Sequence, residues 1–248
     1  MAAMTARALP LRTRIKICGL TREQDVDAAV DAGADAVGFV LYDRSPRRVV
    51  LDRAVELARR LPPFVTPVLL FVNEDAARVA AACRALPRAA AQFHGDETPA
   101  QCLAATEGGR WPYLRAARIP TDPVVPFDLL RFAHDFASAQ ALLLDAHVEG
   151  YGGGGKAFDW SRIPTNVGAH LVLSGGLTPA NVGDGIRQVR PRCRTLAVDV
   201  SSGVEAVTSD GSVLKGIKDA GKIHRFVAAV RAADEQLARG LHDSLPAT

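Results

Sequence analysis

The strongest constraint on the fold is an alternation of short apolar runs with helix-like segments, which recurs eight times along the chain. Runs that are apolar almost throughout are typical of parallel strands covered by helices. Eight such units in one chain of 248 residues predict an α/β fold, a single closed (β/α)8 TIM barrel. The runs are Arg14–Cys18, Asp35–Leu41, Phe64–Phe71, Ala89–Phe93, Pro112–Ala116, Ala141–Leu144, His170–Leu173 and Thr195–Val200.

An open, doubly wound sheet is the alternative architecture, although such sheets usually have fewer strands. The turn Cys18-Gly19-Leu20-Thr21 after the first run does not fit the G-x-G-x-x-G motif that would support that fold. We expect residues 1–13 to form an N-terminal extension, residues 14–233 the barrel, and residues 234–248 a C-terminal tail that frays.

Helix starts are predicted where a capping residue precedes a helix-like segment. The fifth unit is the weakest of the eight, and its helix must lie between Pro126 and Phe136. The predicted caps are Thr21 with Gln24 as a capping box, Asp52, Asn73, and Thr178 followed by Pro179.

Charge and cysteine content argue against several classes of function. The net charge is only +3 and the basic residues are interspersed with acidic ones, which does not fit a nucleic-acid-binding surface. The four cysteines form no C-x-x-C pair, so we expect no metal, no redox motif and a reducing compartment. Apolar stretches of signal-peptide or membrane-span length are lacking in the sequence, so we expect a cytoplasmic protein.

A barrel of this type carries its chemistry at the carboxyl ends of its strands. Alternate side chains along a strand point to opposite faces. Leu142 and Leu144 point opposite to Asp145, and the apolar residues of the eighth run point opposite to Asp199. If these apolar residues face the helices, then Cys18, Asp145 and Asp199 face the barrel mouth. The polar residues at the strand ends or in the following loops are Cys18, Arg47, Asn73, His94, Arg115, Asp145, Ser174 and Asp199.

Two turns rich in glycine and serine predict an anion site. Ser174-Gly175-Gly176 follows the seventh run, and Asp199-Val200-Ser201-Ser202-Gly203 ends the eighth. Backbone N–H groups approach a phosphate closely in such turns, and barrels commonly bind phosphate after strands seven and eight. One Gly-Gly turn alone is more often structural, but the two together favour a phosphate site. Gly152–Gly155 is either a further phosphate contact or a plain mobile loop.

Cys18 and Asp145 are the candidates for proton transfer. A buried structural cysteine is the usual alternative, which Cys83 and Cys102 fit, whereas Cys18 lies where a barrel places reactive groups. A thiolate at Cys18 needs positive charge nearby. Asp145 leaves an apolar strand, a position suited to a general acid, although a helix cap or a loop ion pair would also explain it.

Nine stretches, in this order along the chain, resemble those of a known enzyme family. They are Lys16–Thr21, Gly33–Val40, Ser45–Arg47, Phe71–Asn73, Gln92–Glu97, Leu143–Ala146, Phe158–Trp160, Leu173–Leu177 and Val198–Glu205. With these motifs the chain resembles the phosphoribosylanthranilate isomerases of tryptophan biosynthesis. The resemblance extends from about residue 14 to residue 230.

The resemblance implies an Amadori rearrangement of N-(5-phosphoribosyl)anthranilate to 1-(2-carboxyphenylamino)-1-deoxyribulose 5-phosphate without a cofactor. Cys18 is then the general base at the ribose C2, and Asp145 the general acid at the furanose ring oxygen. Arg47 contacts the anthranilate, whose carboxylate suits a guanidinium. Asp199 touches the amino nitrogen or orients its neighbours, and His94 either lines the mouth or is a structural histidine.

The predicted substrate-binding residues are Arg47, His94, Gly154, Gly155, Ser174, Gly175, Gly176, Asp199, Ser202 and Gly203. Two residues depart from the family pattern. Phe93 stands where leucine is more usual, and Gly154 replaces a small hydroxyl or other residue. Neither touches the residues proposed for proton transfer.

Two other functions are weighed against this one. An isomerase of histidine biosynthesis runs the same chemistry, but that family uses an aspartate where Cys18 stands and needs a second phosphate site, which the third and fourth loops do not resemble. A non-catalytic phosphate-binding barrel is expected to lack the acid or the base. We expect a small phosphorylated substrate as the partner, with no nucleic acid or membrane, and a monomer or homodimer.

Overall fold

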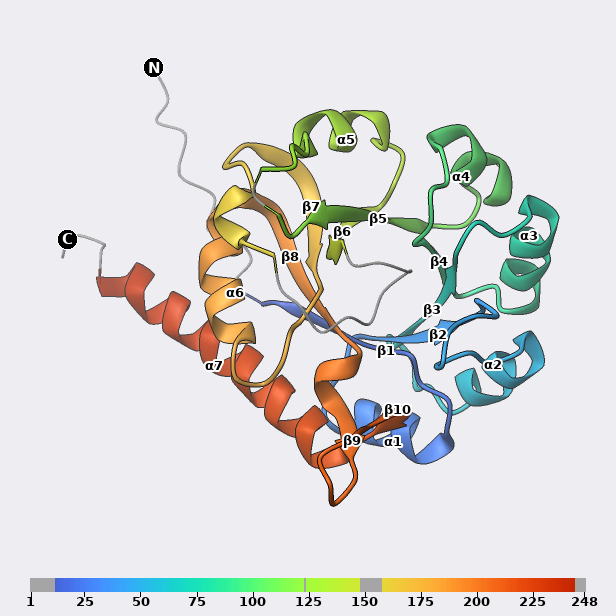
Figure 1. Cartoon of the computed structure of the whole chain (residues 1–248), viewed down its shortest axis with the longest axis horizontal. Helices are drawn as coiled ribbons and strands as arrows, with labels where there is room; N and C mark the ends of the chain where they lie inside the picture. The colour runs from blue at the N-terminus through green and yellow to red at the C-terminus, as the bar shows by residue number, and fades with distance from the viewer. Residues whose placement is uncertain (1–11, 123, 148–157, 244–248) are drawn as a thin grey trace.

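The computed structural model describes residues 12–122, 124–147 and 158–243, and its centre is a closed barrel of eight parallel strands (Figure 1). Each strand pairs with the next in chain order, and β8 pairs with β1 to close the ring. The predicted TIM barrel is confirmed, and this closure excludes the open sheet. The strands are β1 Arg14–Cys18, β2 Ala36–Val40, β3 Thr66–Phe71, β4 Ala90–Phe93, β5 Tyr113–Pro120, β6 Ala141–His147, β7 Val167–Leu173 and β8 Cys193–Val200.

Each predicted apolar run overlaps one strand, but some strands extend beyond their runs. β5 and β6 continue to Pro120 and His147, and their added residues pair with each other, including Arg118 with Asp145. β7 and β8 begin earlier than predicted, and they pair at Val167 and Cys193. Polar residues in the extensions of β5, β6 and β8, and Gly168 in that of β7, interrupt the apolar pattern on which the predicted bounds were based.

Helices cover the outer face of the barrel (Figure 1). After β6, the described residues before β7 contain only a short 3-10 helix, η1 Trp160–Arg162. The last helix packs against the first and sixth and continues to Asp243, past the barrel end predicted at residue 233. The helices are α1 Glu23–Asp31, α2 Leu51–Ala58, α3 Ala76–Ala85, α4 Pro99–Ala105, α5 Leu129–Asp135, α6 Val182–Val189 and α7 Ala220–Asp243.

The capping box predicted from Thr21 is wrong. The Thr21 hydroxyl donates to Gly216 O at 2.7 Å, because a hairpin late in the chain folds over this loop and takes the hydroxyl away from α1. Asp52 lies within the first turn of α2 rather than at its cap, where a negative charge still favours the helix N-terminus. A complete capping box occurs instead at Thr98 and Gln101, where α4 begins.

Asn73 and Thr178 likewise do not cap the helices that follow them. Asp75 caps α3, and Asn73 turns the chain with a φ of 50°. Asn181 is the N-cap residue of α6, and its side chain accepts from Thr178 N–H at 2.8 Å and donates to Gly176 O at 2.9 Å. The glycine turn after β7 is therefore braced from behind by Asn181.

Alternation along the strands separates the core around the barrel from the barrel interior. Ile17 and Leu144 point outward into the large hydrophobic cluster beneath the helices. Ala116, Leu143 and Val172 meet in a separate small cluster inside the barrel. Asp145 follows the outward-facing Leu144 along β6 and shares the inward face with Leu143, as predicted.

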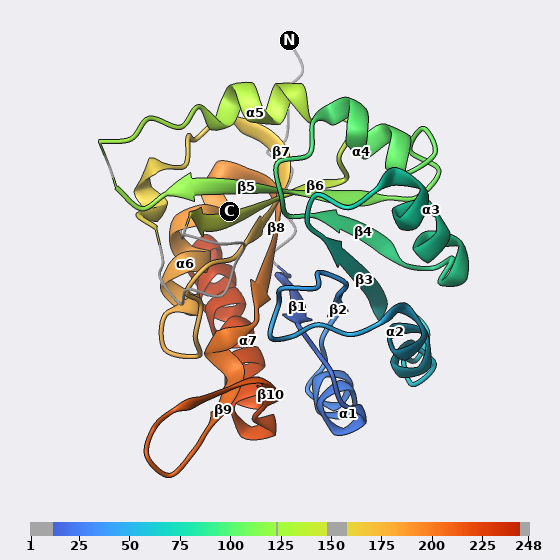
Figure 2. The ribbon, with the colours of Figure 1, turned by 45° about the vertical axis from the view of Figure 1, so that its right-hand side comes forward.

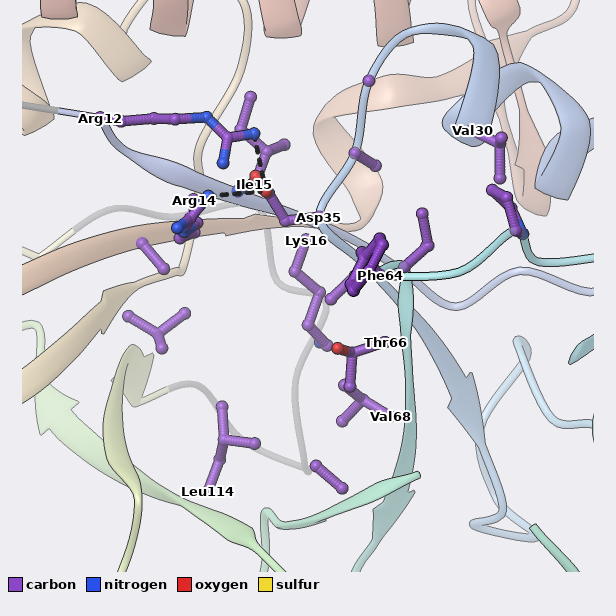
Figure 3. A pocket seen from close by; sticks show the side chains of 18 of the residues that line it. Arg12, Arg14, Ile15, Lys16, Val30, Asp35, Phe64, Thr66, Val68 and Leu114 are labelled. Carbon is purple, nitrogen blue, oxygen red and sulfur yellow. Dashed lines mark hydrogen bonds and ion pairs between the residues drawn. The ribbon is translucent and has the colours of Figure 1, made fainter. Parts of the chain in front are cut away.

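The amino-terminal end of the barrel holds a cavity of about 750 Å³ (Figure 3). Small interior side chains, among them Ala90 and Ala197, line this cavity. The cavity exists because these side chains are too small to fill the bottom of the barrel. Phe64 stands at the rim after Pro62 and Pro63, with 99% of its surface exposed and a φ of 71°. An exposed phenylalanine in a left-handed backbone conformation is unusual and costs free energy.

A two-stranded antiparallel hairpin, β9 Glu205–Val207 and β10 Val213–Lys218, stands outside the barrel between β8 and α7 (Figure 2). A short 3-10 helix, η3 Ser202–Val204, connects β8 to this hairpin. The backbone N–H of Lys218 donates to Asp25 of α1 at 3.2 Å. The hairpin therefore joins the end of β8 to the loop and helix that follow β1.

Candidate active site

Asp145, at the mouth of the barrel on β6, is held by a histidine that follows β4. His94 Nε2 lies 2.9 Å from Asp145 Oδ2, and His94 Nδ1 lies 3.1 Å from Gln92 Nε2. All three side chains are buried. Because Gln92 and His94 alternate with an outward-facing residue, both reach into the barrel and fix the position of the Asp145 carboxyl.

Asp199 connects β8 to its two neighbouring strands. Its Oδ1 accepts from Lys16 Nζ of β1 at 2.7 Å, and its Oδ2 accepts from the Ser174 hydroxyl after β7 at 3.0 Å. The Lys16 and Asp199 side chains are only 5% and 6% exposed. A buried charge is tolerated when it is paired and hydrogen-bonded, as both of these are.

Cys18 lies on the same inward face of β1 as Lys16 and pairs in register with Gly38 of β2. Burial raises the pKa of the Cys18 thiol, the charge of Lys16 opposes that effect, and the net result is a pKa above the ordinary value. Burial alone would lower the pKa of Lys16, but Asp199 and Cys18 raise it above its ordinary value. Lys16 therefore stays protonated beside the thiol. It supplies the nearby positive charge that a thiolate at Cys18 needs.

The two glycine turns meet at the barrel mouth. Gly175 has a φ of 79°, and a Cβ at this position would lie 2.7 Å from Asp145 Oδ1, so only glycine lets the turn approach the carboxyl. Gly203 lies against the carbonyl of Leu177, which would be 1.9 Å from an added Cβ. The second turn therefore packs directly on the first.

Ser174 and Ser202 differ in what they offer to an anion. Both donors of Ser174 are engaged, the N–H with Leu144 O at 2.8 Å and the hydroxyl with Asp199. Ser202 begins η3, and the first N–H groups of a helical turn point toward anions. The structure thus favours Ser202, and the glycines of both turns, over the Ser174 side chain as phosphate contacts.

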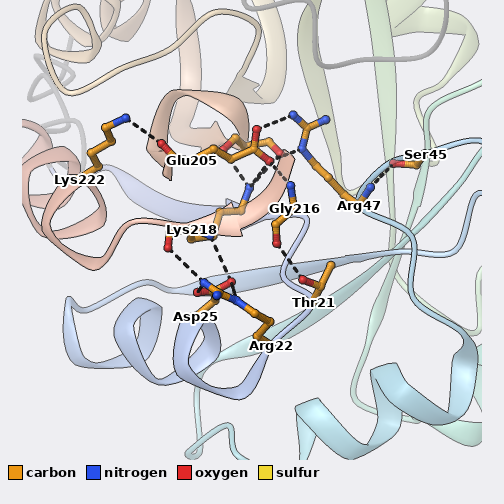
Figure 4. A network of polar contacts seen from close by, with 10 residues as sticks. Thr21, Arg22, Asp25, Ser45, Arg47, Glu205, Gly216, Lys218 and Lys222 are labelled. Atoms are coloured by element: carbon orange, nitrogen blue, oxygen red, sulfur yellow. Dashed lines mark hydrogen bonds and ion pairs between the residues drawn. The ribbon is translucent and has the colours of Figure 1, made fainter. Parts of the chain in front are cut away.

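Arg47, in the loop after β2, forms a two-pronged ion pair with Glu205 of β9 (Figure 4). Arg47 Nε donates to Glu205 Oε1 at 2.7 Å and Nη2 donates to Oε2 at 2.9 Å. Burial alone would raise the pKa of Glu205, but Arg47, Lys218 and the N–H of Gly216 lower it below the ordinary value. Glu205 therefore stays ionised and holds the guanidinium in one orientation.

Two residues expected at the mouth serve other contacts. Arg115 donates to Phe93 O and Gly95 O, both at 3.1 Å, and its guanidinium lies 4.9 Å from the centre of the Phe136 ring on the helix-covered side. Arg115 thus binds the loop after β4 rather than facing the mouth. Asn73 accepts from Asp96 N–H at 2.7 Å, which joins the loops after β3 and β4.

Two of the predicted substrate-binding glycines, Gly154 and Gly155, lie outside the described residues. All four cysteines are buried and free, and Cys193, expected in a polar connection, is the first residue of β8. Throughout the described ranges, no helix is long and apolar enough to cross a membrane, and no three His, Cys, Asp or Glu side chains gather to hold a metal ion.

Sequence reasoning missed three charged residues near the site, namely Lys16, Glu205 and Lys218. Lys16 had a detectable signal, because it lies two residues before Cys18 on the same face of a strand. Glu205 had none, since its partner Arg47 is 158 positions away and the hairpin that carries Glu205 is not part of the barrel repeat. The sequence left two interpretations of His94, a residue lining the mouth or a structural histidine. The structure places it at the mouth, in direct contact with Asp145.

The polar contacts form a row around the mouth, from Lys16 and Asp199 through Ser174 to the turn that touches Asp145. This arrangement places a thiol beside a cation on β1 and a carboxyl on β6, with the two glycine turns between them. It is suited to moving protons on a small phosphorylated molecule.

Comparison with known proteins gives one consistent result. The family described as N-(5'-phosphoribosyl)anthranilate isomerase matches residues 15–229. An N-(5'-phosphoribosyl)anthranilate isomerase of Methylibium petroleiphilum is 63% identical over 228 residues, which cover 92% of this chain and 98% of that protein.

Solved structures agree with the sequence relatives. A phosphoribosylanthranilate isomerase in complex with reduced 1-(o-carboxyphenylamino)-1-deoxyribulose 5-phosphate is 35% identical with a TM-score of 0.73, covering 89% of this chain and 100% of that one. Monomers generated from the dimeric enzyme of Thermotoga maritima are 33% identical with a TM-score of 0.69, at the same coverage. Profile, sequence relatives and barrel geometry lead to one conclusion, that this chain belongs to the N-(5'-phosphoribosyl)anthranilate isomerase family.

Proposed function

We propose that the chain converts N-(5-phosphoribosyl)anthranilate into 1-(2-carboxyphenylamino)-1-deoxyribulose 5-phosphate, with Asp145 as the general acid and Cys18 as the general base. The observation that carries this assignment is the row of buried contacts from Lys16 through Asp199 to Ser174, which lies around the mouth between β1, the strand of Cys18, and β6, the strand of Asp145. It supports an acid and a base held on opposite sides of one small substrate.

The acid step opens the sugar ring. Asp145 donates its proton to the furanose ring oxygen, and the bond from that oxygen to C1 breaks. The lone pair of the anthranilate nitrogen forms a C=N bond to C1, so the charge left by ring opening resides on an iminium. The contact of His94 with Asp145 Oδ2 directs the other carboxyl oxygen, Oδ1, toward the substrate side, where the Gly175 turn approaches it.

The base step moves the double bond. Cys18 removes the proton from C2, the electron pair forms a C1=C2 bond, and the iminium nitrogen becomes an amine. The resulting enol becomes the ketone when its hydroxyl proton is lost and C1 gains a proton. Lys16 supports this step because its charge opposes the effect of burial on the Cys18 thiol.

Substrate binding uses both ends of the molecule. The phosphate binds backbone N–H groups of Gly175, Gly176, Ser202 and Gly203, at the meeting point of the two turns. The anthranilate carboxylate binds Arg47, and fixing both ends holds C2 and the ring oxygen between base and acid.

The direct test is loss of substrate fluorescence with purified protein. We expect turnover by the parent chain and a fall in kcat of about 10²–10⁴-fold for Cys18→Ala and for Asp145→Asn. Cys83→Ala is the matched control, because Cys83 is a buried cysteine on α3, away from the mouth. Near-native turnover in both site variants would overturn the assignment of acid and base.

We also propose that the protein is a homodimer that associates through the cavity at the amino-terminal end of the barrel. Phe64 projects at the rim, and the cavity of about 750 Å³ beside it is larger than a phenyl ring (Figure 3). A two-fold axis near the rim lets each copy insert Phe64 into the other. Burial of one phenylalanine contributes about 1.5–3 kcal/mol, which offsets the cost of its left-handed backbone.

Sedimentation equilibrium measures this association. We expect the parent chain to be a dimer and Phe64→Ser to be a monomer. Val124→Ser is the control, because Val124 is also exposed, at 84%, but does not line the cavity. A parent chain that stays monomeric at micromolar concentration, or a dimeric Phe64→Ser variant, would contradict the proposal.

A further inference from the structure

Glu205 is the point at which the loop after β2 meets both strands of the hairpin (Figure 4). Its side chain has no exposed surface, and its Oε1 accepts from Arg47 Nε at 2.7 Å, Gly216 N–H at 2.8 Å and Lys218 Nζ at 3.3 Å. Its Oε2 accepts from Arg47 Nη2 at 2.9 Å. One carboxylate therefore ties the loop after β2 to the hairpin after β8.

Lys218 extends this contact to the second glycine turn. Its Nζ donates to Ser201 O at 2.9 Å and to Ser201 Oγ at 3.3 Å, next to the proposed phosphate contacts. Arg47 and Ser201 also flank Gly19, where an added Cβ would lie 2.6 Å from Arg47 Cδ and 3.1 Å from Ser201 Oγ. Arg47 and the turn are thus parts of one packed unit.

The charges of this unit do not balance. One carboxylate faces two cations, Arg47 and Lys218, and burial lowers the pKa of Lys218 although pairing with Glu205 raises it. The pair uses Nε and Nη2 of Arg47, and the described part of the chain supplies no acceptor for Nη1. Excess positive charge with a free donor is an arrangement that an anionic ligand completes.

A purely structural role explains this arrangement poorly. Replacing a buried ion pair by apolar side chains is often neutral or stabilising, so such a pair is weak evidence for stability. A fixed orientation of the guanidinium, by contrast, reduces the rotamer entropy that Arg47 loses when it binds a ligand.

We propose that Glu205 is a positioning residue that sets the distance between Arg47 and the turn Ser201–Gly203, so that the carboxylate and phosphate ends of one substrate are recognised together. This inference rests on the proposed function, because it requires a substrate with an anion at each end. Glu205 acts on the substrate through Arg47, while Lys218, which contacts both Glu205 and Ser201, joins this pair to the turn.

A double-variant cycle tests the side that includes Arg47. We expect Glu205→Gln to raise KM for N-(5-phosphoribosyl)anthranilate by about tenfold to a hundredfold, with kcat within a few-fold of the parent, because a charge-assisted two-pronged contact is lost. In the Arg47→Ala background the same change is expected to have no further effect. Lys215→Gln is the matched control, an exposed charge on the same hairpin strand.

A second substrate separates positioning from loss of structure. With the analogue that carries a carboxamide in place of the anthranilate carboxylate, we expect Glu205→Gln and the parent chain to have similar KM values. If Glu205→Gln does not fold, Arg47→Lys replaces it, because lysine keeps the charge but loses the two-pronged contact. Arg47→Lys is then expected to raise KM for the carboxylate substrate only.

Inorganic phosphate, used as a competitive inhibitor, tests the side that includes Lys218. Lys218→Met is expected to weaken inhibition by phosphate severalfold while keeping the preference for carboxylate over carboxamide. Additive effects of Glu205→Gln and Arg47→Ala, or an equal KM increase for both substrates, would overturn the positioning role. Absence of turnover in the parent chain would instead refute the proposed function, so the two failures are distinguishable.

Discussion

Gly38→Ala is expected to damage the site through the addition of a single methyl group. Gly38 of β2 pairs in register with Cys18, and an ideal Cβ at Gly38 would lie 2.7 Å from Cys18 Sγ, 3.2 Å from Cys18 Cα and 3.2 Å from Lys16 Cε. Carbon and sulfur in normal contact are about 3.5–4.0 Å apart, so the thiol must move by roughly 1 Å. The extra methyl therefore displaces the base and its neighbouring cation together.

Two magnitudes follow from this geometry. Overpacking a buried position costs about 1–3 kcal/mol in the free energy of unfolding, which urea denaturation measures. A misplacement of about 1 Å in a reacting group costs about 10²-fold in rate, which the fluorescence assay measures as kcat. The loss of rate is expected to exceed what a partly unfolded population explains, because most molecules remain folded at this cost.

Gly168→Ala is the matched control for both measurements. Gly168 is an exposed strand glycine on β7, and an added Cβ there meets no atom within 4 Å. We expect its turnover to equal that of the parent and its unfolding free energy to change by less than about 0.5 kcal/mol. If Gly38→Ala keeps kcat within twofold of the parent, or Gly168→Ala loses as much, the packing of Cys18 against Gly38 does not control the base.

Three further changes test the surroundings. Lys16→Met removes the charge that lowers the pKa of Cys18, so we expect the pKa of the thiol to rise. The pH profile of kcat/KM is then expected to shift to higher pH, with reduced activity at pH 7. A parallel shift in the pH dependence of Cys18 alkylation checks that the thiol is the cause. His94→Asn is expected to lower kcat more than it changes KM, because it frees the Asp145 carboxyl to rotate; steady-state kinetics separates the two. Asp234→Ala removes the carboxylate that pairs with the buried Arg190, so we expect a loss of about 3–5 kcal/mol in urea unfolding with normal kcat for the folded fraction.

The barrel was predictable because its signal repeats. Eight apolar runs report the same local physics eight times, so an error at one run, such as the late start predicted for β7, does not change the architecture. Helix caps lack this redundancy. Thr21 has the residue type of a cap, yet a carbonyl from the hairpin takes its hydroxyl, and no local pattern around Thr21 contains that information.

The candidate site likewise has features that the local sequence predicts and features that depend on residues far apart in the chain. Alternation within one strand predicts that Cys18 and Asp145 face inward, because side-chain direction is a local property of a strand. The contacts between strands are not local. Ser174 has the sequence of a phosphate-binding serine, but its hydroxyl reaches Asp199 because β7 and β8 are adjacent and each residue comes directly after the register pair Leu173–Val198.

The difference between local and distant information also explains where the charge of the site comes from. Within the proposed machinery, the acid and the base lie on barrel strands, whereas Glu205 and Lys218 lie on a hairpin that the barrel does not need for closure. An insertion outside the repeat can change its side chains without disturbing the strand register. The positions of Arg47 and of the phosphate turn therefore depend on a segment outside the barrel repeat, and substrate recognition is expected to be more sensitive to changes in this hairpin than closure of the barrel is.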